Sequence, residues 1–368
     1  MLRRYRVLWA PLLWALLSVP LAIMLLAPDP AMVDRREMRP LATWPTLSDG
    51  HGGWKRIPAR IDAYLADHFG LRGQMLALEA LITQRLLRNG NPEVLIGHQG
   101  WLFYTAFESL QQSAGVLVRR GRVARTARII DIAARQFAAR GTRLIVAVPP
   151  ASSTIYDAML PAWARSRGRA TEYDLLLAEL AARGVPTLDL RPALRAAADR
   201  QVYFRHDTHW NPLGALLAFN GVAEAMGHAE WRLDPDTELA LAERSGGDLA
   251  RMLGIEDWVN ENVPILSHPA PEAKVPETDR QTPYRLEADR PGPSVLVIGD
   301  SFTRGFFAPM VLRHTGRLAW IHHDGCTLDW GWVAATAPDE VWWMPTERLL
   351  PCQVDAPLPD LAAPVAPG

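Results

Sequence analysis

The chain has 368 residues, and its 39 basic and 40 acidic side chains give a formal net charge of −1. Hydrophobic residues make up 49% and charged residues 21%, which is typical of a globular protein and excludes an intrinsically disordered chain. The balanced charge argues against nucleic acid binding, because counterion release requires a concentrated positive surface. The length fits one large domain or two smaller ones.

The N-terminus combines positive charge with a long apolar segment. Arg3, Arg4 and Arg6 precede residues 7–27, which contain no charged side chain. About 20 apolar residues are enough for a helix to cross a bilayer, and the basic flank favours a cytoplasmic N-terminus. We therefore predict a membrane anchor at residues 1–27, with a cleaved signal peptide as the alternative. Residues 28–57 are rich in Pro, Gly and Trp and predict a linker.

Strands and helices alternate along the rest of the chain. Strands are predicted at residues 94–96, 101–104, 144–148, 186–190, 294–298, 318–322 and 340–343, the first two as a hairpin. Helices are predicted at residues 61–88, 123–140, 172–183, 211–226 and 304–313. The alternation predicts an α/β domain over residues 58–352, with a mainly parallel sheet flanked by helices and residues 144–148 at its buried centre. We expect an irregular surface excursion at residues 228–292 and a disordered tail at residues 353–368.

A serine follows the strand predicted at residues 294–298, in the segment Gly299-Asp300-Ser301-Phe302. In open α/β sheets, functional groups gather beyond the carboxyl ends of the strands. A serine on a tight turn between a strand and a helix exposes its hydroxyl, and the N–H groups of the helix can stabilise an oxyanion. Ser301 is therefore a candidate nucleophile. The alternative is a serine that only caps the next helix.

A second motif, His206-Asp207-Thr208-His209-Trp210-Asn211, precedes the helix predicted at residues 211–226. A nucleophilic serine needs a base, and the base needs a carboxylate that orients it. Residues two positions apart in an extended segment point to the same side, so Asp207 and His209 can touch. The alternatives are a metal site that includes His206, Asp207 and His209, or a buried structural histidine. We assign no metal and no cofactor.

The two cysteines of the chain are Cys326 and Cys352. In an oxidising compartment they would form a disulfide that closes the loop between them. The alternative is a pair of separate buried thiols. Two cysteines without further ligands do not make a zinc site.

Together, the two motifs resemble those of the SGNH hydrolase-like acetyltransferases of the alginate O-acetylation family. Residues 64–72 are similar to the early D-H-F-x-x-R motif of that family, and residues 97–103 to its G-x-x-G-W-L-F hairpin. Residues 246–249 and the pair Glu347-Arg348 also match family positions. The resemblance covers residues 57–350, but Ala151-Ser152-Ser153 replaces a segment in which relatives often have a basic residue.

The resemblance implies an SGNH hydrolase-like fold in which the order of the motifs is permuted relative to SGNH esterases. It implies that Ser301 is the nucleophile, His209 the base and Asp207 the residue that orients it. It further implies acetyl transfer to hydroxyls of an exopolysaccharide through an acetyl-serine, with a multi-spanning membrane acyltransferase as the acetyl donor. The protein would then be held in the bacterial inner membrane by a single N-terminal span, with its catalytic domain in the periplasm.

Three further residues near the motifs, Arg304, Asn211 and Trp210, are candidate substrate-binding residues. For Arg304 the alternative is a solvated arginine of the first helical turn, and for Trp210 it is packing beneath the catalytic loop, which we favour. A polysaccharide acetyl esterase would need the same nucleophile, base and carboxylate. A non-enzymatic polysaccharide-binding scaffold would carry them unused. The sequence identifies neither the polysaccharide nor the hydroxyl that is acetylated.

Overall fold

A computed structural model of the chain describes residues 57–68, 91–270, 273–276 and 281–362, with a few short stretches before residue 57. The chain divides into two compact units. Pro92–Leu249 and Val259–Gly368 form the unit that contains both motifs, and Met1–Asn91 with Ala250–Trp258 form the other. The unit with the motifs thus starts later than the boundary predicted at residue 58.

Most of the predicted membrane anchor at residues 1–27 and of the predicted linker at residues 28–57 lies outside the described residues. So do residues 69–90, which include most of the helix predicted at residues 61–88; its first part is helix α2 (Ile57–Asp67). No helix in the described part of the chain is long and apolar enough to span a bilayer. The short strands β1 (Val33–Asp34) and β2 (Arg39–Pro40) pair in antiparallel fashion.

Five strands among the described residues form one sheet in the order β5-β11-β9-β10-β8. They are β5 (Arg143–Val146), β8 (Tyr284–Glu287), β9 (Ser294–Gly299), β10 (Arg317–His322) and β11 (Glu340–Met344). Four of them run parallel, and β8 pairs with β10 in antiparallel fashion at one edge. The predicted α/β fold with a mainly parallel sheet is confirmed.

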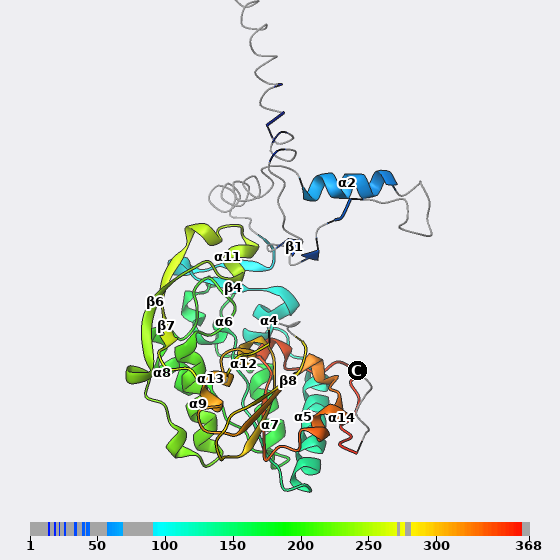
Figure 1. The fold of residues 1–368 in the computed structure, drawn as a ribbon, viewed down its shortest axis with the longest axis vertical. Coiled ribbons are helices and arrows are strands. Elements are labelled where there is room, and N and C mark those ends of the chain that lie inside the picture. The colour runs from blue at the N-terminus through cyan, green and yellow to red at the C-terminus, as the bar shows by residue number, and fades with distance from the viewer. Residues whose placement is uncertain are drawn as a thin grey trace, which may run out of the picture. The chain divides into compact units, whose positions relative to one another are not determined.

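The central strand β9 shows why helices cover both faces of this sheet. Every residue of β9 is buried. Val295 and Val297 enter one hydrophobic core, whereas Leu296 and Ile298 enter another, as the two-residue period of a strand requires. Helix α9 (Pro212–Ala225) packs in the first core. Helices α5 (Arg120–Ala138) and α7 (Glu172–Ala181) pack in the second, on the other side of the sheet (Figure 1).

The remaining elements are short. The predicted hairpin is confirmed as β3 (Val94–Ile96) and β4 (Leu102–Tyr104). The other helices are α4 (Ser109–Ser113), α6 (Ser152–Ile155), α8 (Arg191–Ala196), α10 (Pro235–Glu238), α11 (Asp248–Met252), α12 (Ser301–Arg304), α13 (Ala308–Val311) and α14 (Trp330–Ala335).

Three predicted elements differ from the observed ones. Strand β5 lies at an edge of the sheet and not at its centre, which β9 occupies. Residues 186–190 form only a single bridge, from Thr187 to Val146. The helix predicted at residues 304–313 is split into α12 and α13, because Gly305 ends the first and Pro309 lies in the first turn of the second.

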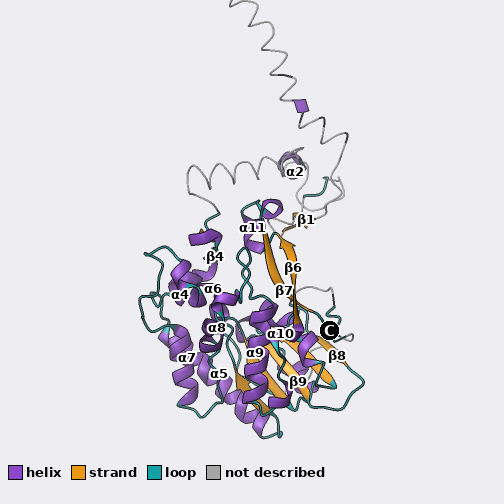
Figure 2. Cartoon of the chain, turned by 90° about the vertical axis from the view of Figure 1, so that its left-hand side faces the viewer, coloured by secondary structure: helices purple, strands orange, loops and turns teal. Residues whose placement is uncertain are grey.

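The prediction of an irregular excursion at residues 228–292 is wrong. Strands β6 (Leu239–Ser245) and β7 (Asn260–Leu266) pair in antiparallel fashion over seven residues each and form a long ribbon (Figure 2). Strand β8 from the same region joins the main sheet. Proline within a strand argues against a central position but is tolerated in a two-stranded ribbon, and Pro264 of β7 pairs with Leu241 of β6.

The prediction of a disordered tail is wrong for residues 353–362. Ala356 and Leu361 are only 1% and 3% exposed. Side chains of α5 and of the turn after it donate hydrogen bonds to this segment, from Gln136 to the Pro359 carbonyl (2.8 Å) and from Arg140 to the Leu361 carbonyl (3.0 Å). Residues 363–368 lie outside the described part of the chain.

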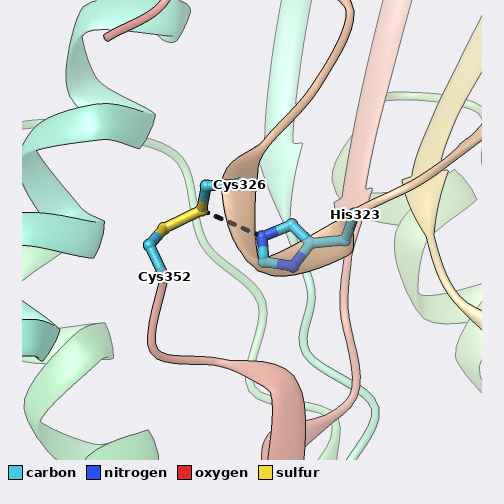
Figure 3. Close-up of side chains that lie close together, drawn as sticks. All are labelled: His323, Cys326 and Cys352. Carbon is cyan, nitrogen blue, oxygen red and sulfur yellow. Dashed lines mark hydrogen bonds between the residues drawn. A yellow bond between two sulfur atoms is a disulfide. The ribbon is translucent and has the colours of Figure 1, made fainter. Parts of the chain in front are cut away.

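A disulfide joins Cys326, which follows β10, to Cys352 at the start of the C-terminal segment (Figure 3). The Nε2 atom of His323 lies 3.2 Å from the Cys326 sulfur, and burial lowers the pKa of His323 to about 4. The His323 backbone N–H donates a hydrogen bond of 2.6 Å to the Gly299 carbonyl. The disulfide therefore ties the C-terminal segment to the end of β9.

We expect the double substitution Cys326→Ser and Cys352→Ser to lower the free energy of unfolding by about 3 kcal/mol, because the closed loop restricts the unfolded chain. Urea unfolding with and without a reductant measures the effect. The reductant should destabilise the wild type and leave the double variant unchanged. Equal stability of wild type and double variant under oxidising conditions would contradict this expectation.

Candidate active site

Ser301 is the first residue of α12, immediately beyond the end of β9. The backbone of Gly299 pairs with β10 and β11, so the turn is held from both sides. A Cβ atom at Gly299 would overlap the Thr303 hydroxyl, and only glycine fits there. The tight turn follows from these contacts and leaves the Ser301 side chain partly exposed.

The carboxylate of Asp300, the residue between Gly299 and Ser301, also holds the turn in place. It caps α12 by accepting a hydrogen bond of 2.9 Å from the Phe302 N–H. Its second oxygen accepts two bonds of 2.8 Å from the backbone N–H and the hydroxyl of Thr346, which follows β11. Asp300 is only 1% exposed, so the residue before Ser301 serves the structure of the turn.

The structure brings Ser301, His209 and Asp207 into one hydrogen-bonded relay. The His209 Nε2 atom lies 2.8 Å from the Ser301 Oγ atom. The His209 Nδ1 atom lies 2.6 Å from Asp207 Oδ1, which also accepts a bond of 3.1 Å from the His209 backbone N–H. These contacts fit the tautomer in which Nδ1 donates to Asp207 and Nε2 accepts the Ser301 proton.

The loop that carries His209 is held in place by backbone contacts between the residues before and after it. The Phe204 N–H donates to the His209 carbonyl (3.2 Å), and Trp210 forms a bridge with Tyr203. The Asn211 side chain then caps α9 by accepting bonds from two backbone N–H groups of the first turn.

The expectation that Trp210 and Asn211 contact substrate is therefore wrong. Both side chains are fully buried, with no exposed surface. The Trp210 indole donates a hydrogen bond of 2.8 Å to the Phe302 carbonyl, and Asn211 donates to the Gln201 carbonyl. Trp210 packs beneath the loop and links it to the nucleophile turn, which is the interpretation favoured from the sequence.

Arg304 is half-buried at the end of α12. Its guanidinium donates to the Pro276 carbonyl (3.0 Å) and lies 5.6 Å above the rings of Tyr284 and Trp320. A contact between Arg304 and substrate stays a prediction.

Asp207 is held in its ionised form by neighbours that the sequence did not indicate. Its Oδ2 atom accepts a bond of 2.7 Å from Arg244 of β6 and a bond of 3.2 Å from the Asp248 N–H. Burial alone would raise the pKa of Asp207, but His209 and Arg244 outweigh it and hold the pKa well below its usual range. The β6–β7 ribbon thus supplies the counter-ion of the relay.

A second carboxylate, that of Asp248, braces the loop between Asp207 and His209. It accepts bonds from the Thr208 backbone N–H (2.7 Å) and hydroxyl (2.6 Å), and its Oδ2 atom lies 3.5 Å from His209 Nδ1. Burial and the nearby charge of Asp207 raise the pKa of Asp248. The preceding Gly247 has a φ of +139°, and a Cβ atom there would overlap the His206 carbonyl. The match of residues 246–249 to family positions was the one signal for this contact in the sequence.

We expect Arg244→Gln to lower kcat/KM about 10-fold and the free energy of unfolding by about 2 kcal/mol, because it leaves a buried carboxylate without its cation. Asp207 has a depressed pKa, so its contribution to stability is present above the unfolded pKa near ~4. That contribution is lost as the pH falls through the folded pKa, which the substitution raises. On the acid side, the pH at which activity falls and the pH at which stability falls should therefore both be higher than in the wild type.

Urea unfolding and initial rates measured across the acid range test this expectation. Arg135→Gln is the matched control, because Arg135 pairs with Asp131 on α5 but its side chain is 75% exposed. The control should change stability by less than about 0.5 kcal/mol. If neither of these pH values moves in Arg244→Gln, Arg244 does not hold the Asp207 charge.

Two groups of side chains in the described residues have the spacing of metal ligands. One is Asp207, His209 and Asp248, in which both ring nitrogens of His209 already face Asp207 and Ser301. The other is His323 with the two cysteines, whose sulfur atoms are bonded to each other (Figure 3). His206 belongs to neither group, and its Nδ1 atom lies 3.9 Å from Glu261. The three side chains considered as metal ligands, His206, Asp207 and His209, therefore do not make up a group with ligand spacing among the described residues.

The backbone N–H of Ser301 has no hydrogen-bond acceptor in the described part of the chain. It lies at the first position of α12, where the helix dipole favours negative charge. A tetrahedral intermediate on Ser301 Oγ would place an oxyanion within reach of this donor. The arrangement therefore contains a nucleophile, a base, an orienting carboxylate and a free N–H donor, which is the set that acyl transfer requires.

The chain is similar to known acetyltransferases over most of this unit. Residues 94–316, more than half of the chain, match the family described as SGNH hydrolase-like domain, acetyltransferase AlgX. The proteins named probable alginate O-acetylase AlgJ from Pseudomonas aeruginosa and Pseudomonas syringae are 28% and 26% identical over 256 and 219 residues. These matches cover 67% and 58% of this chain but only 61% and 54% of the relatives, so the chain spans little more than half of their length.

A solved structure gives the same fold. Bacillus cereus PatB1 is 12% identical, with a TM-score of 0.51 over 71% of this chain and 97% of that chain. The matched segment includes Asp207, His209 and Ser301, which the fold brings together. The chain belongs to the family of SGNH hydrolase-like AlgX acetyltransferases.

Proposed function

We propose that this protein is an O-acetyltransferase that transfers acetyl groups to hydroxyls of an exopolysaccharide, with Ser301 as the covalent carrier. The observation that supports this most strongly is the continuous relay from Ser301 Oγ through His209 to Asp207. Relatives named as probable alginate O-acetylases support alginate, or another polymer that contains uronic acids, as the acceptor.

In the first half of the reaction, His209 Nε2 takes the proton of the Ser301 hydroxyl as Oγ attacks the acetyl carbonyl carbon of the donor. The Ser301 N–H stabilises the oxyanion, and a donor of this kind is typically worth about 10²–10³ in rate. Asp207 stabilises the imidazolium that forms. The intermediate then collapses to acetyl-Ser301, and the leaving group of the donor takes the proton from His209.

The second half repeats these steps with a sugar hydroxyl. His209 removes the proton of the acceptor hydroxyl as its oxygen attacks the acetyl-Ser301 carbonyl. Collapse of the intermediate releases the sugar O-acetyl ester, and His209 returns the proton to Ser301 Oγ. Water in place of the sugar hydroxyl would make the same site an esterase.

The proposed setting follows from the apolar N-terminal segment at residues 7–27. That segment would hold the catalytic domain at the periplasmic face of the inner membrane. Acetyl-CoA does not reach the periplasm, so the acetyl group must be delivered by another protein. A multi-spanning acyltransferase in the same membrane fits this need.

Incubation with a chromogenic acetyl ester, with and without an acidic oligosaccharide, tests the proposed function. We expect acetylated oligosaccharide, detected by mass, together with faster consumption of the ester when the acceptor is present. Acetate as the single product at every acceptor concentration would assign the esterase reaction. Unchanged ester in all samples would favour an inactive scaffold.

A further inference from the structure

Arg348 is a half-buried cation close to the nucleophile, and no acidic side chain among the described residues pairs with it. Its guanidinium carbon lies 5.2 Å above the ring of Phe302, the residue after Ser301, and 5.5 Å above the ring of Tyr104. Across the ranges that the structure describes, its side chain makes neither an ion pair nor a hydrogen bond. Arg244, the other cation at the relay, is instead paired with Asp207.

The two residues before Arg348 are held firmly near the nucleophile turn. Thr346 bonds twice to Asp300, the residue before Ser301. The buried Glu347 accepts hydrogen bonds from the Ala151 N–H (2.8 Å) and from the Thr154 hydroxyl (2.7 Å). These bonds place Arg348 near Ser301 before any ligand arrives.

The ring contacts of Arg348 also leave the N–H donors at the edge of its guanidinium available. A guanidinium that lies over aromatic rings keeps its N–H donors in the plane, where they can bind a carboxylate through two parallel bonds. Neither an acetyl ester nor a sugar hydroxyl is charged. An uncompensated cation beside this nucleophile therefore indicates that another part of the substrate carries the negative charge.

We propose that Arg348 binds the carboxylate of a uronic acid residue in the acceptor polysaccharide and so presents a sugar hydroxyl to acetyl-Ser301. This inference rests on the proposed function, including its acidic acceptor, and adds the residue that recognises the negative charge. Rings of Tyr104 and Phe302 hold the guanidinium, and the free edge receives the sugar carboxylate. Arg348 is thus a specificity-determining residue of the acceptor site.

Binding measured by titration calorimetry tests the proposal on the full-length protein without an acetyl donor. The two probes are a hexasaccharide of uronic acid residues and the same hexasaccharide with its carboxyl groups reduced to primary alcohols. We expect the wild type to bind the acidic probe about 10-fold or more tightly than the reduced one, because one charge-assisted bidentate pair is lost.

Two variants and a control identify the source of this preference. Arg348→Gln should bind both probes about equally, and Arg348→Lys should keep part of the preference because it keeps the charge without the planar edge. The control is Arg317→Gln, which removes an exposed charge at the first residue of β10, at the opposite end of the sheet. The control should keep the full preference.

The proposal is overturned if the wild type does not prefer the acidic probe, if Arg348→Gln keeps the preference, or if Arg317→Gln loses it equally. Circular dichroism of each variant shows that it is folded. Because no acetyl donor is present, these outcomes are independent of whether Ser301 becomes acetylated. A failure of the proposed function and a failure of this inference can therefore be told apart.

Discussion

We expect Ser301→Ala to lower kcat/KM for a chromogenic acetyl ester by at least about 10³-fold, because the covalent step loses its nucleophile. Trp210 still bonds to the Phe302 carbonyl and Asp300 still caps α12, so the turn should keep its shape. Urea unfolding should therefore show nearly wild-type stability. Initial rates of ester hydrolysis measure the loss.

The matched control is Ser267→Ala, which removes the hydroxyl of an exposed serine just beyond β7. It should leave the rate within about twofold of the wild type, since isolated surface substitutions have small effects. A Ser301→Ala protein that turns over the ester at the rate of this control would show that Ser301 does not carry the acetyl group.

Asp207→Asn is expected to lower kcat about 10³–10⁴-fold, although it changes the side chain by a single group. An asparagine can present its NH₂ to His209 Nδ1, which favours the tautomer that cannot accept the Ser301 proton at Nε2. It also leaves Arg244 without its carboxylate. The rate should remain low across the whole pH range, because the charge that stabilises the imidazolium is absent at every pH.

Asp236→Asn is the control for this substitution, because Asp236 pairs with Arg200 but its side chain is 75% exposed. It should change kcat by less than about twofold. Stopped assays across the pH range, with circular dichroism to verify folding, give the comparison. An Asp207→Asn protein with wild-type kcat at any pH would remove Asp207 from the relay.

Ser301, His209 and Asp207 could be predicted from the sequence because strand ends and short extended segments place side chains in a regular way. Ser301 follows a strand with a long apolar run, and the carboxyl ends of parallel strands meet at one edge of the sheet. Asp207 and His209 have a spacing that lets a short extended segment bring them together. Their distance from Ser301 in sequence carried no such information, and only the fold shows the contact between His209 and Ser301.

The residues that support the relay were missed because they come from a ribbon without a clear pattern. In β6 the side chains are half-buried or exposed, so neither a fully apolar run nor a buried face indicated a strand. Arg244 reaches Asp207 across 37 positions of sequence, and such a pair depends on the register of the ribbon. A charged residue in a proline-rich segment gives no local sign that it will bind a buried carboxylate.

Residues next to His209 in sequence were in turn given a contact with substrate that the structure does not support. Asn211 and Trp210 are candidates for substrate contact because they adjoin the His209 motif in sequence, although packing is favoured for Trp210, and both are fully buried. Proximity in sequence does not separate the residues that face a substrate from those that hold the loop. Arg348 shows the reverse, since it lies 47 positions from Ser301 but stacks on the ring of Phe302.

In the proposed reaction Ser301 carries the acetyl group with the help of His209. Rapid quenching of the full-length protein with an acetyl ester, followed by peptide mass spectrometry, tests it most directly. We expect an acetyl group on Ser301 that forms before acetate or acetylated sugar accumulates and that is absent in His209→Ala. Turnover without acetyl-Ser301, or an acetyl group on another residue that forms at the rate of turnover, would contradict it.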